Sequence, residues 1–135
     1  MKYWIGVVGT KQTLERFNNG ESDWFCLPRS ASLGDVIIMY ATKKLARQNH
    51  GFFGVYKIVR LDPTSNQLCN KYGINQGTLI HVDLLVINSF KNKITLPDLK
   101  SHPIHQNMSF VRRNAQGTSF SISEAEYAFI LSKSQ

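Results

Sequence analysis

The stretch Leu33-Gly34-Asp35-Val36-Ile37-Ile38-Met39-Tyr40-Ala41 decides the fold. Its opening, Leu33-Gly34-Asp35, is a turn signal, because glycine next to aspartate favours a tight change of direction. The residues from Val36 to Ala41 are continuously apolar, and a short apolar run after a turn is typical of a strand covered on both faces. We therefore expect the central strand of a sheet here.

Apolar, aromatic and β-branched segments elsewhere predict three more strands. They run over Tyr3–Val8, Phe52–Val59 and Leu79–Ile87. Gly54 lies inside the second of them and suggests a β-bulge or a close approach of another backbone segment. In the third, a period of two places His81 and Asp83 on one face. Residues 61–77 and 88–93 carry turn signals, and we expect loops there.

Capping patterns predict three helices. Their N-caps are Thr10, Thr95 and Ser123. The first helix carries Leu14 and Phe17 on one face and stops near Asn19-Gly20. Ser123 forms a capping box with Glu126, which indicates a final helix over Glu124–Leu131.

Nothing in the 135 residues separates two domains, since the sequence has no internal repeat, low-complexity tract or long linker. We expect one domain over residues 1–135 with an α+β fold, a small mixed β-barrel of about five to six strands flanked by short helices. The formal charge of +7 suits a polyanionic partner, although charge of this size can also serve solubility alone.

The two cysteines, Cys26 and Cys69, lack the density and paired spacing of a secreted disulfide framework. We expect both to be reduced. No stretch approaches the ~20 apolar residues of a membrane span, and no cleavage site follows the short apolar N-terminal segment. These features together predict a soluble cytoplasmic protein that does not bind membranes.

Motifs of the common cofactor-binding and hydrolase classes are absent from the sequence. His102 and His105 could share a turn, but a zinc site would lack its Cys or carboxylate partners. Asp98 and Lys100 match half of a nuclease-type metal site, for which Asp83 is the nearby upstream carboxylate. Helix capping explains Asp98 better. We expect neither a metal nor a cofactor.

Aromatic residues close to basic ones are the main functional signal. An aromatic face stacks on a base for about 1–3 kcal/mol, and cations meet phosphates. Most of the aromatic residues lie in expected strands and belong to the core. Trp24 and Phe25 lie in a stretch that we expect to be irregular, where a large ring either covers the core or lines a site. The basic segment Thr42–His50 could grip a nucleic-acid backbone, but it is almost as typical of a solvated loop.

Several segments, in their order and spacing, resemble the EVE domain, a relative of the YTH and ASCH domains in the PUA-like superfamily. They are Tyr3–Val8, Leu33–Tyr40, Gly51–Tyr56, Thr95–Leu99, Met108 with Arg112, and Ser119-Phe120 running into Ile122–Glu126. The resemblance spans essentially the whole chain. It implies a PUA-like barrel whose pocket accepts a flipped or splayed base that carries an added group.

The resemblance also implies a set of ligand-binding residues. They are Gly9, Thr10, Trp24, Phe25, Cys26, Tyr40 and Arg112. Gly9 and Thr10 would meet the base edge, and Trp24 would stack on the base. Tyr40 would face the same cavity, while Arg112 would contact a phosphate or the base. The residues expected at the nucleic-acid backbone are Lys43, Lys44, Arg47 and Arg113.

We therefore expect a non-catalytic reader that binds one modified base of DNA or RNA: methylated or hydroxymethylated cytosine, or methylated adenine. A restriction or RNA-processing protein is the partner that the resemblance suggests. One alternative is an ASCH-like amidohydrolase or ribonuclease acting on modified nucleosides or RNA, which would need Thr10, Lys11 and an acid such as Asp83 to converge. Another is an RNA-binding module that is indifferent to modification.

Overall fold

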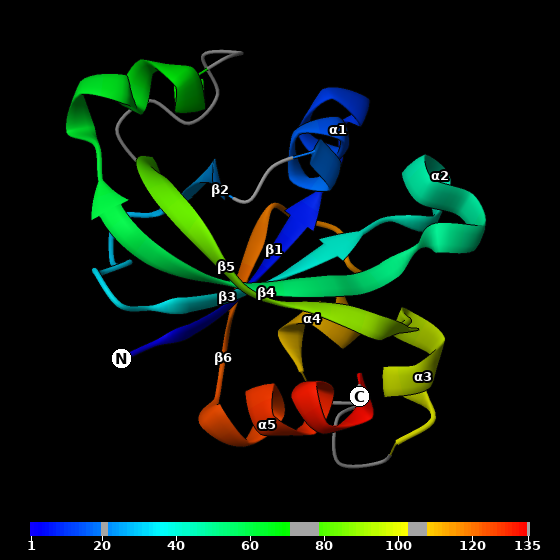
Figure 1. Cartoon of the computed structure of the whole chain (residues 1–135). Coiled ribbons are helices and arrows are strands. Elements are labelled where there is room, and N and C mark those ends of the chain that lie inside the picture. Colours follow the sequence, from blue (N-terminus) through cyan, green and yellow to red (C-terminus); the bar gives the residue numbers. More distant parts are fainter. Residues whose placement is uncertain (20–21, 71–78, 103–107, 135) are drawn as a thin grey trace.

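A single curled sheet organises the computed structural model, which describes residues 1–19, 22–70, 79–102 and 108–134. Its six strands follow the order β2-β5-β4-β3-β1-β6. Their bounds are β1 Tyr3–Val8, β2 Ser22–Pro28, β3 Val36–Ala41, β4 Gly51–Leu61, β5 Leu79–Ile94 and β6 Ser119–Ile122. β1 and β3 run parallel, and the other pairs are antiparallel. The sheet closes partway into a barrel (Figure 1), which is a PUA-like α+β fold.

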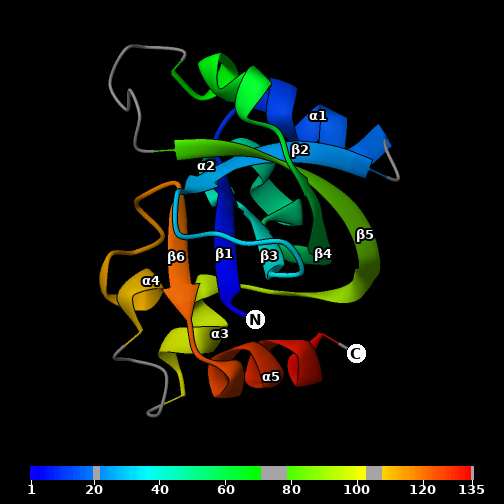
Figure 2. The same cartoon turned by 90° about the vertical axis from the view of Figure 1, so that its left-hand side faces the viewer.

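Short helices cover the two ends of this half-barrel (Figure 2). The helices are α1 Lys11–Asn19, α2 Lys43–Ala46, α3 Leu96–Lys100, α4 Ser109–Arg112 and α5 Glu124–Lys133, and the 3-10 segments are η1 Arg47–Asn49 and η2 Pro63–Asn70. The three predicted N-caps are confirmed. Thr10 accepts a hydrogen bond from the Thr13 amide at 3.3 Å, and Thr95 and Ser123 each open a complete capping box.

The central strand β3 is buried along its whole length, as predicted. On one face, Ile38 and Tyr40 join a core cluster that includes Phe52. On the other face, Ile37 and Met39 join a second cluster. Because successive side chains of a strand point to opposite faces, one continuous apolar run supplies both clusters.

The turn before β3 is held by a buried carboxylate. Gly34 has a φ of 86°, which favours glycine, and Asp35 follows it with an exposed fraction of 1%. Asp35 accepts hydrogen bonds from the Lys2 amide at 2.9 Å, the Ser32 amide at 2.9 Å and the Trp4 indole at 3.1 Å. Burial raises the pKa of Asp35, but these hydrogen bonds and the Lys2 charge outweigh it and leave the pKa below its ordinary value.

Three expectations about local structure are wrong. Residues 88–93 continue β5 instead of forming a loop, because β5 keeps pairing with β4 across a shift in register, with Asn88 opposite Val55 and Ser89 opposite Gly54. This shift confirms the bulge at Gly54, where a Cβ would lie 3.2 Å from the Asn88 carbonyl oxygen. Residues 63–70 form η2, and residues 71–77 lie outside the described part. Trp24 and Phe25 belong to the regular strand β2, not to an irregular stretch.

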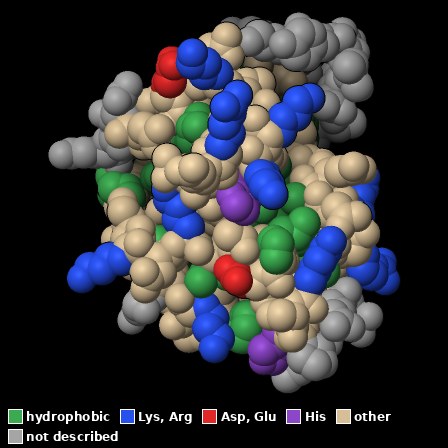
Figure 3. All heavy atoms as spheres, turned by 90° about the vertical axis from the view of Figure 1, so that its right-hand side faces the viewer, with side chains coloured by type: hydrophobic (Ala, Val, Ile, Leu, Met, Phe, Trp, Pro, Cys, Tyr) green, Lys and Arg blue, Asp and Glu red, His purple; other side chains and the backbone are tan. Residues whose placement is uncertain are grey.

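Basic side chains spread over the face of the molecule that carries α2 (Figure 3), with few acidic ones among them. Lys43, Lys44 and Arg47 are exposed in this part of the chain. Among the described residues no helix is long and apolar enough to cross a bilayer.

Candidate functional site

A cavity of about 540 Å³ lies beside β2, and we call it the β2-side cavity. Its walls come from the end of β1, the first turns of α1, β2, η2 and the start of β5, with Gly117 and Thr118 closing it before β6. The volume falls within the range of about 300–1,000 Å³ that is typical of small-molecule sites.

Strand alternation explains why β2 brings Trp24 and Cys26 to this cavity. β2 pairs with β5, and its residues Phe25 and Leu27 belong to the core cluster beneath. Trp24 and Cys26 therefore point to the other face of the strand. Phe25 is buried but still reaches the cavity wall.

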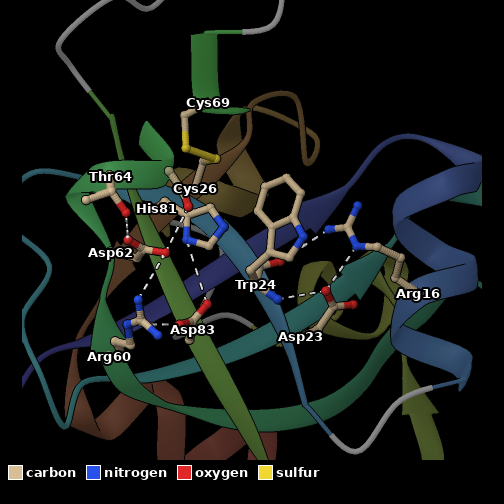
Figure 4. A network of polar contacts seen from close by, with 11 residues as sticks. Arg16, Asp23, Trp24, Cys26, Arg60, Asp62, Thr64, Cys69, His81 and Asp83 are labelled. Carbon is tan, nitrogen blue, oxygen red and sulfur yellow. Dashed lines mark hydrogen bonds and ion pairs between the residues drawn. A yellow bond between two sulfur atoms is a disulfide. The ribbon is translucent and has the colours of Figure 1, made fainter. Parts of the chain in front are cut away.

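The indole of Trp24 is held between two other side chains. It stacks on the His81 imidazole at 4.7 Å between ring centroids, and the Arg16 guanidinium lies 4.2 Å from the indole centroid. Figure 4 shows these two groups on either side of the indole. A base that stacks on Trp24 must therefore share an indole face with Arg16 or His81, or displace one of these two groups.

Arg16 is itself fixed by Asp23. Its Nε lies 3.0 Å from Asp23 Oδ1, and its Nη2 donates to the Trp24 carbonyl at 3.3 Å. The same Asp23 oxygen accepts from the Trp24 amide at 2.7 Å. The Asp23 side chain has an exposed fraction of 6%. Burial of the Tyr56 hydroxyl, together with the Asp23 charge, raises the pKa of Tyr56 to about 12. These contacts fix the indole before any ligand arrives.

A chain of polar contacts leads from His81 to η2. Asp83 lies 3.7 Å from His81 Nδ1 and 3.6 Å from Arg60 Nε, and Arg60 also lies 3.5 Å from Asp62 (Figure 4). Asp62 accepts hydrogen bonds from Thr64, which does most to hold its pKa below the ordinary value, and from Ser65. The network orders the start of η2, whose far end forms a cavity wall.

Cys26 and Cys69 form a disulfide with an S–S distance of 2.05 Å. The expectation that both are reduced is therefore wrong. The two cysteines are 43 positions apart and gave no paired spacing, and only the fold brings η2 against β2. Because both cysteines line the β2-side cavity, the bond ties two of its walls together.

The structure brings five of the seven expected ligand-binding residues together around the β2-side cavity. They are Gly9, Thr10, Trp24, Phe25 and Cys26. Tyr40 is not among them, and the expectation that it faces this cavity is wrong. It has an exposed fraction of 3% and packs edge-to-face on Phe52 and Phe110 inside a core cluster.

The other expected residues lie apart from the β2-side cavity. Arg112 and Arg113 are exposed at the end of α4. Lys43, Lys44 and Arg47 belong to the α2–η1 segment. Leu14 and Asn18 face that segment, while Thr13 and Arg16 face the β2-side cavity, so α1 stands between the two regions.

Sequence reasoning missed Arg16 and the wall formed by η2. The signal for Arg16 was present, because Thr13 and Arg16 are three residues apart and lie opposite Leu14 on a helix. No local pattern places Gly117 and Thr118, which reach the cavity only through the pairing of β6 with β1.

The alternative metal and catalytic sites gain no support from the part of the chain that the structure describes. No group of three or more potential ligands could hold a metal ion among those residues. Asp98 caps α3 by accepting from the Thr95 amide at 2.8 Å. His105 lies outside the described residues. Thr10 lines the β2-side cavity, whereas Lys11 and Asp83 do not.

Comparison with solved structures finds the same fold in proteins of low sequence identity. A protein from Pseudomonas syringae is 16% identical with a TM-score of 0.76, covering 98% of this chain and 99% of that one. Human THYN1, solved in complex with DNA containing 5-methylcytosine, is 16% identical with a TM-score of 0.69 and covers 100% and 98%. A mutant ASCH protein from Zymomonas mobilis is 13% identical with a TM-score of 0.62, and each chain is covered completely.

A comparison with curated protein sequences finds no match. The family model of the EVE domain matches residues 2–133, which is nearly the whole chain. The chain therefore belongs to the EVE domain family.

Proposed function

We propose that this chain binds a single modified base of DNA or RNA in the β2-side cavity. The candidates are methylated or hydroxymethylated cytosine and methylated adenine. The observation that carries the proposal is a cavity of about 540 Å³ beside an indole that Arg16 and Asp23 fix in place. The complex of human THYN1 with DNA containing 5-methylcytosine supports it, because that protein shares the fold.

The cavity offers the two kinds of surface that such a base needs. The first turns of α1 contribute polar groups, among them the hydroxyls of Thr10 and Thr13, which are hydrogen-bonded to each other at 2.8 Å. Polar groups of this kind can pair with the donors and acceptors of a base edge. The disulfide, Leu68 and Leu79 form an apolar wall, against which a methyl group can pack.

Titration of labelled single-stranded oligonucleotides tests the proposal. The oligonucleotides are identical except at one position. This position holds unmodified cytosine, unmodified adenine, 5-methylcytosine, 5-hydroxymethylcytosine or N6-methyladenine. We expect one modified oligonucleotide to bind best. Trp24→Ala should lower the affinity for this oligonucleotide about 5- to 150-fold, which corresponds to about 1–3 kcal/mol of stacking.

Phe129→Ala is the control, because it removes a half-buried ring of α5, outside the cavity walls. Equal, weak binding of every oligonucleotide that Trp24→Ala leaves unchanged would overturn the proposal.

We further propose that the chain reads the base without converting it. An ASCH-like hydrolase would need Thr10, Lys11 and an acid to converge, and Asp83 is engaged with Arg60 and His81 instead. Incubation with the matching nucleosides, followed by chromatography, checks this point, since any product would contradict a purely binding role. A partner protein for restriction or RNA processing, and a cytoplasmic location, stay predictions.

A further inference from the structure

A second cavity of about 410 Å³ lies on the other side of α1, and we call it the α2-side cavity. The α2–η1 segment, β3, β4 and β5 all contribute to its walls. We infer that it binds a nucleotide neighbouring the recognised base on the same strand. The inference rests on the proposed function of the β2-side cavity and extends it from one base to a short stretch of strand.

An aromatic ring and two amides give the α2-side cavity the means to hold a base. Phe53 lines the cavity and is half-buried, and its ring stands edge-to-face on Phe17 with 6.0 Å between centroids. The core therefore supports Phe53 on one side while the cavity borders it on another. Asn18 and Asn49 also line the cavity, and each amide can both donate to and accept from a base edge.

The surroundings of the α2-side cavity supply positive charge for phosphates. Lys93 lines the cavity, and Lys43, Lys44 and Arg47 are exposed on the adjoining segment. None of these four cations forms an ion pair with another described residue. Figure 3 shows basic side chains spread over this face. Cations without acidic partners favour a polyanionic strand, because phosphates that bind them release counterions.

The basic segment has a defined shape. Thr42 caps α2 by accepting from the Leu45 amide at 3.4 Å, and Arg47 adopts a φ of 52°. His50 Nδ1 lies 2.6 Å from the Arg47 carbonyl oxygen. A non-glycine residue with positive φ is uncommon, and such conformations concentrate at ligand sites. The segment therefore presents its cations from a folded turn beside the cavity.

The position of α1 connects the two cavities. Thr13 and Arg16 line one cavity while Leu14 and Asn18 line the other. Only the width of this helix separates them, and a helix with its side chains is about 10–12 Å across. A strand whose base enters the β2-side cavity can therefore reach the α2-side cavity with a neighbouring nucleotide.

Binding measurements with two probes test the inference. The probes are the nucleoside 5-methyl-2′-deoxycytidine and a single-stranded pentadeoxynucleotide with 5-methylcytosine at its centre. We expect the wild type to bind the pentanucleotide on the order of tenfold more tightly than the nucleoside, because phosphates and a flanking base add interactions. In the double variant Asn49→Ala/Lys93→Gln, most of this tenfold difference should disappear, while the affinity for the nucleoside should equal that of the wild type. Both positions are exposed, so the fold should survive.

The salt dependence gives an independent readout. For a single strand, the slope of log K against log salt should fall by about 0.7 for each phosphate that the variant no longer neutralises. Lys57→Gln is the matched control, because Lys57 is an exposed lysine of β4 outside both cavities. It should leave the tenfold difference and the slope unchanged.

Two results would overturn the inference in distinguishable ways. If the nucleoside binds but the double variant keeps the full preference for the pentanucleotide, the α2-side cavity does not hold the strand and the proposed function stands. If neither of these probes binds, and neither do the same two probes made with 5-hydroxymethylcytosine or N6-methyladenine, the proposed function fails, and the inference that rests on it fails too.

Discussion

The two cavities beside α1 differ in how their walls are held together. In the β2-side cavity, a disulfide joins β2 to η2, and Asp23 and Arg16 fix the indole of Trp24. In the α2-side cavity, one wall is a short segment held by the Thr42 cap and the His50 contact with Arg47. One wall is tied to the sheet by a covalent bond, and the other depends on local hydrogen bonds.

This difference suggests a division of labour between specificity and affinity. A rigid cavity discriminates between similar bases, because a wrong shape cannot be accommodated by small shifts. A surface of exposed cations and amides tolerates many sequences, because every nucleotide has a phosphate and a π-face. Under our proposal, the β2-side cavity selects the base and the α2-side cavity holds its neighbour.

Removal of the disulfide should have the largest effect. The bond closes a loop with a sequence separation of 43, and chain entropy predicts that the variant Cys26→Ser/Cys69→Ser loses about 4 kcal/mol of unfolding free energy. The measurement is chemical denaturation without reductant. Dithiothreitol should lower the unfolding free energy of the wild type to a similar extent and leave that of the variant unchanged. An unfolding midpoint of the wild type that is insensitive to dithiothreitol would contradict the role of the bond.

A larger side chain at Gly9 should separate binding from folding in the β2-side cavity. A Cβ at Gly9 would meet no atom within 4 Å, and Gly9 is not among the residues with positive φ. Gly9→Leu should therefore keep its unfolding free energy within about 0.5 kcal/mol. Since Gly9 lines the cavity, we expect nucleoside affinity to fall at least about tenfold, or about 1.4 kcal/mol. Gly9→Ala should show a smaller loss in the same titration, and equal affinities in all three proteins would place the base elsewhere.

Loss of the Arg16 guanidinium should make the walls of the β2-side cavity less firmly held and so reduce the difference between the two cavities. Arg16→Met keeps the aliphatic stem but removes the cation–π interaction and the ion pair with Asp23, so we expect a decrease of about 1 kcal/mol in unfolding free energy. Arg60→Met is the control, because Arg60 is 65% exposed and its ion pairs with Asp62 and Asp83 are longer. Urea denaturation measures the unfolding free energy of both variants. An equal loss of unfolding free energy in the two would show that the guanidinium does not hold the indole.

The features that sequence predicted best are local ones. The apolar run of β3 and the caps at Thr10, Thr95 and Ser123 depend on residues close in the chain, and all are confirmed. The Cys26–Cys69 bond depends on how η2 folds against β2, and no spacing rule contains that information. The resemblance to known domains pointed to five residues that line one cavity, which composition alone could not do.

The position of Tyr40 could not be predicted from the strand pattern. A period of two indicates which residues of a strand share a face, but not what covers each face. β3 is apolar on both sides, so its pattern could not decide which residues would cover Tyr40. The packing of α4 decides it, because Phe110 lies against the Tyr40 ring.

Neutralising the exposed cations of α2 should have the smallest effect and still distinguish the two cavities. Lys43→Gln/Lys44→Gln removes two exposed charges without ion-pair partners among the described residues, so unfolding free energy should change by less than about 0.5 kcal/mol. Nucleoside affinity should stay the same, because neither lysine lines the β2-side cavity. With the pentanucleotide, the salt slope should fall by about 0.7 for each phosphate left without its lysine. A variant that loses nucleoside affinity as well would show that base selection and strand holding are not separate, because charge outside the β2-side cavity would then be setting the affinity for the base.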